Sequence, residues 1–473
     1  MIIYSYKFIA AFFVLFWAYW ILCRNKNSQN IVLLLASYIF YGMWDWRCLP
    51  LLFATSIVAY GVGIYSMSHQ EREIQVFGKS SRWWVSCGAI VFCLCILCYF
   101  KYANFFIRSV NDLVGSSFDS LSIILPVGIS FYTFSTISYI VDVYQSKFEP
   151  TNDFVSVLLY TSFFPAILSG PIHKATEQMP QWLRKRDFDY DLVSKGFKEY
   201  IWGAFMKLCV ADRLGMYVDA VYANIENHSG NTLLFTSLAY TFQIYADFAG
   251  YSLMAIGCGK MLGVNLQNNF NLPYFSKSIT EFWSKWHMSL TGWFKNYVYF
   301  PLGGNRVGKP RWIFNIIIVF LLSGLWHGAA YTFIIWGAIH GIAQVIEKLI
   351  YGNRIKNISP GLTISNGFRV LVTFVIVSFA WIFFRMPNVG QAFSVIRKIF
   401  MNYGELYIDP TLYLGLASLM ILVVKDAFDQ ANLNIKLFQS RFTAVRFMSL
   451  AFIISFILLF GVLEGGQFIY FQF

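Results

Sequence analysis

The sequence has few charged residues for its length. Only 13% of its 473 residues are Asp, Glu, Lys or Arg, whereas soluble globular proteins carry about 25%. Hydrophobic residues make up 57% of the chain, and the mean hydropathy is +0.55. This composition excludes an ordinary soluble protein. Apolar runs recur at the length needed to cross a bilayer, so the sequence predicts a multi-pass membrane protein.

Several signatures of soluble enzymes are also missing. The sequence contains no Walker loop, nucleophile elbow or dinucleotide-binding fingerprint. Its His, Cys, Asp and Glu residues do not have the spacing of a metal site, so no metal is predicted. Three of the eight cysteines, Cys93, Cys95 and Cys98, lie in an apolar run without sharing one helix face. We interpret them as small hydrophobic residues.

The net charge of +12 does not indicate a nucleic-acid partner. In a membrane protein, Lys and Arg mark cytoplasmic loops and contacts with lipid headgroups. The partner that this charge predicts is therefore the lipid bilayer, and no nucleic acid.

The apolar runs predict an all-α fold of roughly eleven to thirteen transmembrane or re-entrant helices, forming a single integral-membrane domain over residues 1–473. The first run, within residues 1–23, is too long for a signal peptide and is predicted to be a retained helix. Two polar stretches, 173–198 and 265–311, interrupt the pattern. Irregular backbone beside membrane spans lines a cavity or lies at the interface.

His327 is the residue that most strongly indicates a functional site. It lies between Trp312 and Ile346, a stretch without Asp, Glu, Lys or Arg. An imidazole at membrane depth is costly to bury, and it titrates near neutrality, which suits proton transfer. Gly324 and Gly328 would let another backbone or a substrate approach closely. The alternative interpretation is a hydrogen-bonded packing residue.

Two further ionisable side chains lie in weakly polar surroundings. His287, in the irregular stretch, has the same two interpretations as His327. Asp247, inside an apolar segment, either pairs with a buried cation or histidine or lines a wet cavity, and pairing is favoured. Of the other histidines, His69 and His228 lie in polar loops and are predicted to be solvated.

An ordered set of short motifs runs through nearly the whole chain. They are LPVGISFYTF (125–134), FFP (163–165), SGPI (169–172), VADRL (210–214), YADFAGYS (245–252), NFNLPY (269–274), SITEFW (278–283), WHMSL (286–290), YFPLGGN (299–305) and GLWHG (324–328). In this order they resemble the membrane-bound O-acyltransferase superfamily. The most similar branch O-acetylates bacterial polysaccharides such as alginate.

The resemblance implies an enzyme with a tunnel through the bilayer. His327 matches the superfamily's catalytic histidine, and His287 matches a second histidine that this branch needs. The implied donor is a cytoplasmic acyl thioester, acetyl-CoA, used as a substrate rather than a bound cofactor. The residues assigned to the tunnel are Asp247, Trp283, Lys285, Asn305 and Trp326.

The resemblance also allows a mechanism to be stated. A neutral His327 would take the proton of the attacking hydroxyl. His287 would either orient the acceptor or stabilise the developing oxyanion. The sequence does not separate these two roles.

The chain ends in QFIYFQF, residues 467–473. Taken alone, this string is typical of an aromatic helix end at a membrane interface. It is similar, however, to a C-terminal tyrosine motif of this branch. The resemblance implies that Tyr470 accepts the acyl group and presents it to a periplasmic partner, an acetyltransferase like the SGNH hydrolases, which would modify the polysaccharide.

The predicted function is therefore an O-acetyltransferase of the bacterial inner membrane that passes acetyl groups from the cytoplasmic donor across the membrane, for O-acetylation of a cell-surface polysaccharide. One alternative is D-alanyl transfer from a carrier-protein thioester to teichoic acid. Another is a transporter with intramembrane histidines. A transporter predicts charged pairs in several spans, or inverted repeats, and neither is clear in the sequence.

Overall fold

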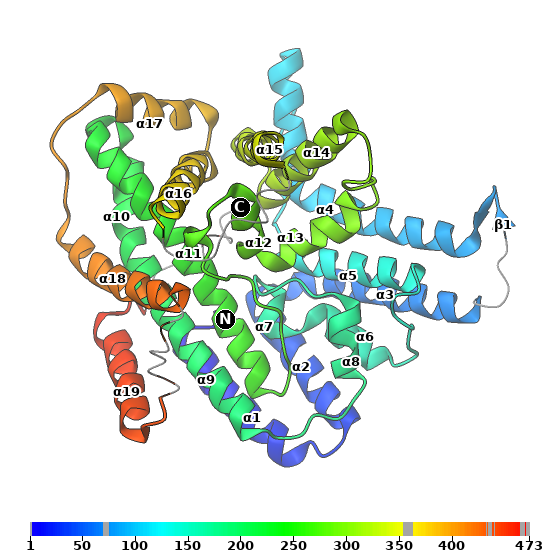
Figure 1. Cartoon of the computed structure of the whole chain (residues 1–473). Coiled ribbons are helices and arrows are strands. Elements are labelled where there is room, and N and C mark those ends of the chain that lie inside the picture. The colour runs from blue at the N-terminus through cyan, green and yellow to red at the C-terminus, as the bar shows by residue number, and fades with distance from the viewer. Residues whose placement is uncertain are drawn as a thin grey trace. The chain divides into compact units, whose positions relative to one another are not determined.

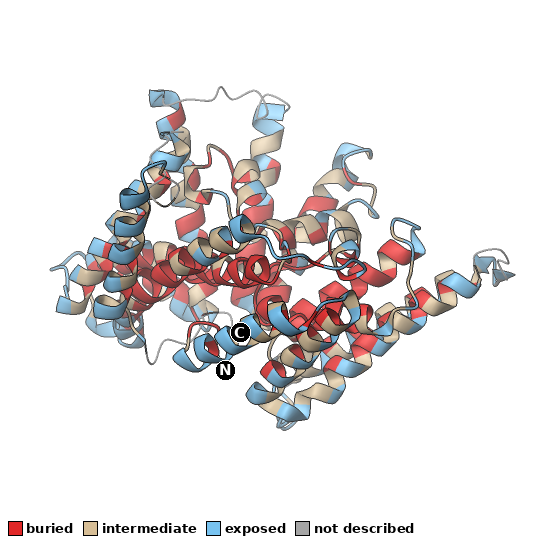
Figure 2. Ribbon diagram, turned by 90° about the horizontal axis from the view of Figure 1, so that it is seen from below, coloured by how far each residue is buried: buried red, intermediate tan, exposed pale blue. Residues whose placement is uncertain are grey.

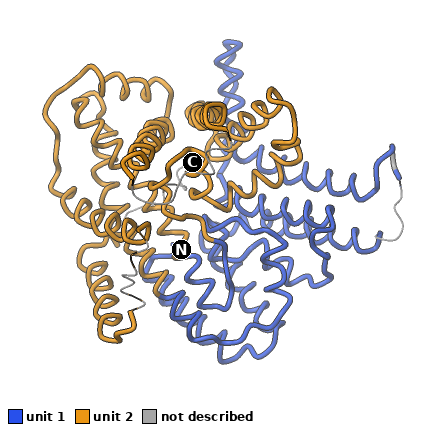
Figure 3. The backbone as a smooth tube through the Cα atoms, in the orientation of Figure 1, with its two compact units in different colours: residues 1–197, 255–267 blue, residues 198–254, 268–473 orange. Residues whose placement is uncertain are grey.

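The computed structural model describes residues 2–69, 75–352, 363–431, 433, 438, 440–463 and 469, and these residues form an all-α fold. Within these ranges the only strands are β1 (Gln75–Val76) and β2 (Lys79–Ser80), which pair as a short antiparallel hairpin. The chain divides into two compact units (Figure 3). Unit 1 comprises residues 1–197 and 255–267, and unit 2 comprises residues 198–254 and 268–473.

Unit 1 holds the N-terminal helices, and Figure 1 labels the α-helices among them. They are α1 (Tyr6–Leu22), α2 (Lys26–Asp45), η1 (Trp46–Cys48), α3 (Leu49–Ser68), α4 (Ser81–Val114), α5 (Ile129–Tyr144), α6 (Phe154–Ser162), α7 (Phe164–Ile167), α8 (Ala175–Trp182) and the first half of α9 (Tyr190–Phe205). The last turns of α11 (Gly230–Met261) complete it.

Unit 2 holds the end of α9, most of α11 and everything after residue 267. Its other elements are η2 (Met206–Ala211), α10 (Asp212–Ala223), η3 (Ile225–Asn227), η4 (Pro273–Phe275), α12 (Ile279–Lys285), α13 (Met288–Phe294), η5 (Lys295–Tyr299), α14 (Lys309–His327), α15 (Tyr331–Tyr351), α16 (Ile364–Arg385), α17 (Val389–Met401), α18 (Pro410–Gln430) and α19 (Thr443–Phe460). Both η2 and η5 are π-helical turns.

The predicted multi-pass membrane architecture is confirmed. Seven helical segments among the described residues are long and apolar enough to cross a bilayer. They are Lys26–Ser68, Ser81–Val114, Lys309–His327, Tyr331–Tyr351, Ile364–Arg385, Pro410–Gln430 and Thr443–Phe460. Buried and exposed residues alternate along many helices (Figure 2), and large apolar side chains such as Phe13 and Leu459 lie on open faces. Such apolar faces are typical of lipid contact.

Two of the apolar runs in the sequence, residues 153–172 and 120–141, form helices that are broken or shorter than the run, each for a local reason. The run at 153–172 divides into α6 and α7 at Phe163, where Pro165 begins the second helix because proline fits only the first turn. The run at 120–141 becomes helical only from Ile129, after Gly128 takes a left-handed conformation. A Cβ at Gly128 would lie 2.4 Å from the backbone oxygen of Ile167, so the site requires glycine.

Arg186, in the polar stretch 173–198, is buried in unit 1. Arg186 donates hydrogen bonds to Tyr19 Oη at 2.7 Å and to Asn30 Oδ1 at 2.6 Å, and its guanidinium lies over the Trp182 ring. Gln29 binds the Arg186 backbone on both its N–H and C=O. This arginine therefore ties α1, α2 and α8 together, instead of marking a solvated loop.

Candidate active site

His327 is the last residue of α14, and α15 packs closely against this helix. A Cβ at Gly324 would lie 2.2 Å from the backbone oxygen of Phe333, and one at Gly337 would lie 2.3 Å from that of Phe320. A Cβ at Gly328 would lie 2.0 Å from the Phe333 ring. The close approach predicted at Gly324 and Gly328 is therefore made by α15 of the same chain, and small residues are what permit it.

The His327 side chain is enclosed by aromatic rings. It is only 3% exposed. Its ring centroid lies 4.9 Å from that of Trp326, 5.0 Å from that of Trp336 and 5.2 Å from that of Phe384. Three helices, α14, α15 and α16, supply this enclosure, which excludes bulk water and restricts how the imidazole can turn.

His287 joins α12 to α13 in an unusual backbone conformation. Its φ is +43° and its ψ is +54°, the left-handed region that non-glycine residues rarely adopt. Strain of this kind costs about 1–3 kcal/mol and persists only where the surroundings enforce it, often at functional sites. The side chain is fully buried, and the Met288 N–H next to it donates to the Asn269 backbone oxygen at 2.9 Å.

Asn269 determines which nitrogen of His287 carries the proton. The Ser289 N–H, which can only donate, contacts one side-chain atom of Asn269 at 3.3 Å, so this atom is Oδ1. The Ser289 hydroxyl donates to the same oxygen at 2.6 Å, and Asn269 Nδ2 donates to Ser252 Oγ at 3.0 Å. His287 Nδ1 lies 3.3 Å from this acceptor, so Nδ1 bears the hydrogen and Nε2 carries the free lone pair.

The burial of His287 keeps its imidazole neutral. Desolvation lowers its pKa from 6.5 to about 3, because a buried ring loses the hydration that stabilises the charged form. Its Nε2 has no hydrogen-bond partner among the described residues. Near neutral pH this nitrogen is therefore a buried hydrogen-bond acceptor.

The fold brings the two predicted histidines together. The ring centroids of His287 and His327 lie 6.4 Å apart, with 54° between the ring planes. Trp326 contacts both rings, at 5.9 Å from His287 and 4.9 Å from His327. Phe248 of α11 packs edge-on against His287 at 4.6 Å. Two imidazoles in one dry aromatic cluster can accept a proton and orient a hydroxyl within a single site.

A third histidine, His340, belongs to the same cluster. The Trp283 indole N–H donates to His340 Nδ1 at 3.3 Å, which places the histidine's hydrogen on Nε2. The Trp336 ring lies 5.0 Å from both His340 and His327. The sequence indicated no role for His340 and did not single out Asn269. Both residues stand in polar or small-residue surroundings without a spacing that indicates chemistry.

Asp247 has the paired arrangement that the sequence analysis favoured. Its Oδ1 lies 2.5 Å from Lys207 Nζ, which also binds Asp212 Oδ1 at 2.7 Å. All three side chains are buried. Neither Lys207 nor Asp212 was predicted, although Asp212 lies within the VADRL motif.

Of the other residues predicted to line a tunnel, two are buried beside the histidines and two are not. Trp283 and Trp326 are buried in the aromatic cluster, whereas Asn305 is exposed. Lys285 forms an ion pair with Glu281 at 2.8 Å. Within the described contacts, neither Lys285 nor Asn305 bonds to a histidine. Tyr470 lies outside the described residues.

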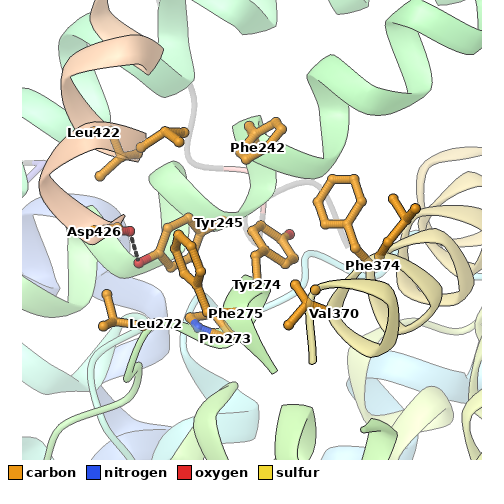
Figure 4. Close-up of a pocket in the computed structure, with 13 residues that line it drawn as sticks. Phe242, Tyr245, Leu272, Pro273, Tyr274, Phe275, Val370, Phe374, Leu422 and Asp426 are labelled. Carbon is orange, nitrogen blue, oxygen red and sulfur yellow. Dashed lines mark hydrogen bonds between the residues drawn. The ribbon is translucent and has the colours of Figure 1, made fainter. Parts of the chain in front are cut away.

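An apolar cavity of about 260 Å³ adjoins the cluster within unit 2 (Figure 4). Residues of α11, η4, α16 and α18 line it: Phe242, Tyr245, Leu272, Pro273, Tyr274, Phe275, Gly367, Val370, Leu371, Phe374, Leu422, Val423 and Asp426. One polar pair faces it, in which the Tyr245 hydroxyl donates to Asp426 at 2.9 Å. Tyr245 and Tyr274 also contact Trp286, the residue before His287. These contacts connect the wall of the cavity to the aromatic residue that precedes His287.

Comparison with known proteins gives consistent matches. A family model described as "MBOAT, membrane-bound O-acyltransferase family" matches residues 94–386, a range that includes both His287 and His327. The chain is 36% identical over 380 residues to the Pseudomonas aeruginosa protein named "Probable alginate O-acetylase AlgI", covering 80% of this chain and 70% of that protein.

Two further relatives differ in their named acceptors. The Helicobacter pylori "Peptidoglycan O-acetyltransferase" is 34% identical over 420 residues, covering 82% of this chain and 78% of that protein. The Bacillus subtilis "Teichoic acid D-alanyltransferase" is 29% identical over 229 residues, covering 46% of this chain and 57% of that protein.

Proposed function

The chain belongs to the membrane-bound O-acyltransferase family and is an acyltransferase, and we propose that it O-acetylates a cell-surface polysaccharide. Relatives that cover most of this chain are named for acetylation of alginate and of peptidoglycan, and these names support the proposed acceptor class. The relative named for D-alanyl transfer aligns with less than half of this chain. We therefore favour acetyl as the transferred group, taken from acetyl-CoA on the cytoplasmic side of the inner membrane.

The observation that carries the proposal is the pair of buried imidazoles at 6.4 Å in one aromatic cluster. His327 acts as the general base. It takes the proton of the attacking hydroxyl while that oxygen bonds to the thioester carbonyl carbon. The carbon–sulfur bond then breaks, and the proton passes to the departing thiolate, so that an ester and a free thiol are formed.

His287 orients the acceptor hydroxyl in this mechanism. The sequence left open whether it orients the acceptor or stabilises the oxyanion. An oxyanion needs a hydrogen-bond donor, whereas the hydrogen that Asn269 fixes on Nδ1 leaves only a lone pair on Nε2. This arrangement supports the orienting role, in which Nε2 accepts from the hydroxyl. It is less suited to binding a negative oxygen.

We further propose that Tyr470 receives the acetyl group first and passes it to a periplasmic acetyltransferase. The support is the C-terminal tyrosine motif, together with a hydrogen bond that ties the neighbouring Ile469 to unit 2. The partner would then choose the polysaccharide, which is consistent with the different acceptors named for the relatives.

The test uses the purified full chain in liposomes with radiolabelled acetyl-CoA, followed by mass spectrometry of the C-terminal peptide. We expect label on that peptide in the wild type and a loss of at least about a hundredfold in His327→Ala, the lower end of what one general base contributes. The matched control is His69→Ala, at the half-buried C-terminal end of α3. Undiminished transfer in His327→Ala would overturn the catalytic assignment. Carrier-protein D-alanyl thioester, tested in parallel, identifies the donor.

A further inference from the structure

The segment that leaves α19 is bonded to η2 and α10. The Phe460 backbone oxygen accepts from Arg213 Nε at 2.7 Å, and the Val462 N–H donates to the Leu208 backbone oxygen at 3.0 Å. Leu208 lies in the π-helical turn η2, and single π-helical turns are frequent at functional sites. The start of the C-terminal segment is therefore held by the elements that carry Lys207 and Asp212.

A second attachment lies close to the end of the chain. Ile469 is buried, and its N–H donates to Asp247 Oδ2 at 2.8 Å. The other oxygen of Asp247 pairs with Lys207, which shares its charge with Asp212. A backbone N–H bonded to an ionised carboxylate makes a charge-assisted hydrogen bond, which is about twice as strong as a neutral one. Because the site is buried, losing the contact would leave polar groups without partners.

The two carboxylates that bind Lys207 differ in one respect. Asp247 binds the C-terminal segment as well as Lys207. Asp212 binds Lys207, and its Oδ2 has no hydrogen-bond partner among the described residues. Asp212 shows that a carboxylate can pair with Lys207 without binding the C-terminal segment. Pairing with Lys207 therefore does not by itself explain why Asp247 also accepts from the Ile469 N–H.

Asp247 lies on the part of α11 that supports His287. Phe248, the next residue, packs against the His287 ring at 4.6 Å. Ser252, little more than one turn later, accepts from Asn269, which in turn holds His287 Nδ1. One short stretch of α11 thus contacts both the C-terminal segment and the support of the catalytic cluster.

We propose that Asp247 is a positioning residue that latches the chain's own C-terminal segment, through the Ile469 N–H, beside the histidine cluster. This inference rests on the proposed function, since the segment that Asp247 holds carries Tyr470, the proposed acceptor. The ammonium of Lys207, paired with Asp247 Oδ1, favours the ionised form of this buried carboxylate. In this scheme Asp247 contacts neither the acetyl donor nor the acceptor hydroxyl. Its effect on acetyl transfer comes through the C-terminal segment (the tail) that it holds.

The experiment compares Asp247→Ala with Asp212→Ala in the purified full chain. Each variant removes one of the two carboxylates that the structure shows bound to Lys207, so the two share the same change in buried charge. Only Asp247→Ala removes the acceptor of Ile469. Trimming by carboxypeptidase, followed by intact mass, measures how often the tail opens. We expect trimming past residue 469 to be about ten- to hundredfold faster in Asp247→Ala, and near the wild-type rate in Asp212→Ala.

A second pair of variants leaves the buried charges untouched, in case Asp247→Ala does not fold. Ile469→Pro removes the backbone N–H, whereas Ile469→Ala keeps it and loses only side-chain contacts. We expect fast trimming in Ile469→Pro and clearly slower trimming in Ile469→Ala. Equal trimming within either pair would overturn the latch.

The same samples separate the latch from the proposed function. With the latch broken, the rate of acetyl transfer to the C-terminal peptide should fall at least about tenfold while the melting temperature in detergent stays near the wild-type value. A general loss of folding would lower both the rate and the melting temperature. His327→Ala should abolish transfer and leave the tail protected. A protected tail without acetyl transfer in the wild type would contradict the proposed function and leave the latch standing. An unprotected wild-type tail would contradict the latch alone.

Discussion

Asn269 Oδ1 lies 3.3 Å from His287 Nδ1 and also accepts from the Ser289 N–H and hydroxyl. This single oxygen fixes the proton of a buried imidazole and supports its left-handed backbone. It thus links the NFNLPY motif to the WHMSL motif, and both motifs to α11 through Ser252. The chemical character of His287 depends on this contact as much as on its own side chain.

Asn269→Ala should lower acetyl transfer by about ten- to a hundredfold, the cost that is usual when a histidine that binds a metal loses the residue that orients it. Without Asn269, the hydrogen on His287 Nδ1 can move to Nε2. The Nε2 lone pair that accepts a hydrogen bond from the acceptor hydroxyl is then lost. The matched control is Asn271→Ala, whose side chain is exposed two residues away. Initial rates with labelled acetyl-CoA would measure both, and equal rates in the two variants would contradict the role given to Asn269.

Gly324→Ala should destabilise the protein by about 1–3 kcal/mol or more, because its Cβ would lie 2.2 Å from a backbone oxygen of α15. Backbone atoms cannot turn aside as a flexible side chain can, so α14 and α15 must separate and move His327. Gly88→Ala in α4 is the control, since a Cβ there meets nothing within 4 Å. We expect it to leave the melting temperature in detergent unchanged or raised. A normal melting temperature and activity in Gly324→Ala would show that the packing of α14 against α15 tolerates the extra carbon.

Stability should fall as the pH drops below 6.5, and His287 should contribute to this fall. Its pKa is 6.5 when unfolded and about 3 when folded, so between these values the unfolded chain binds a proton that the folded protein does not. Acid therefore favours unfolding by about 1.4 kcal/mol per pH unit, or about 2 kcal/mol at pH 5. Chemical unfolding between pH 7.5 and 5 should show a shallower decline in His287→Gln than in the wild type. Parallel curves would mean that His287 takes up its proton in the folded state.

Tyr470→Phe should abolish acetyl on the C-terminal peptide, because phenylalanine has no hydroxyl to accept it. Tyr403→Phe, at an exposed tyrosine after α17, should transfer normally. In cells that also make the periplasmic partner, polysaccharide acetylation should fall with the first variant only. Normal acetylation with Tyr470→Phe would remove the relay from the mechanism, and the assignments of His327 and His287 would be unaffected.

The sequence by itself determined the class of the protein. Low charge and repeated apolar runs predict membrane helices. In lipid every backbone N–H and C=O must find a hydrogen-bond partner within the protein, and a helix supplies these partners within a single segment. His327 and His287 could be singled out because an imidazole is conspicuous in apolar surroundings and because the ordered motifs identify the family. The pairing of Asp247 was also favoured in advance, since a lone buried carboxylate is costly.

Only the tertiary structure decided which groups act on one another. Asn269 and His287 are 18 residues apart, Lys207 and Asp247 are 40 apart, and Ile469 reaches Asp247 across 222. Side-chain hydrogen bonds between distant segments depend on how the helices pack, and packing leaves no periodic pattern in the chain. The left-handed backbone at His287 is held by such contacts, since the N–H groups of Met288 and Ser289 both donate to Asn269. For that reason the sequence could identify the histidines, whereas the proton arrangement of His287 and the attachment of Ile469 to Asp247 required the fold.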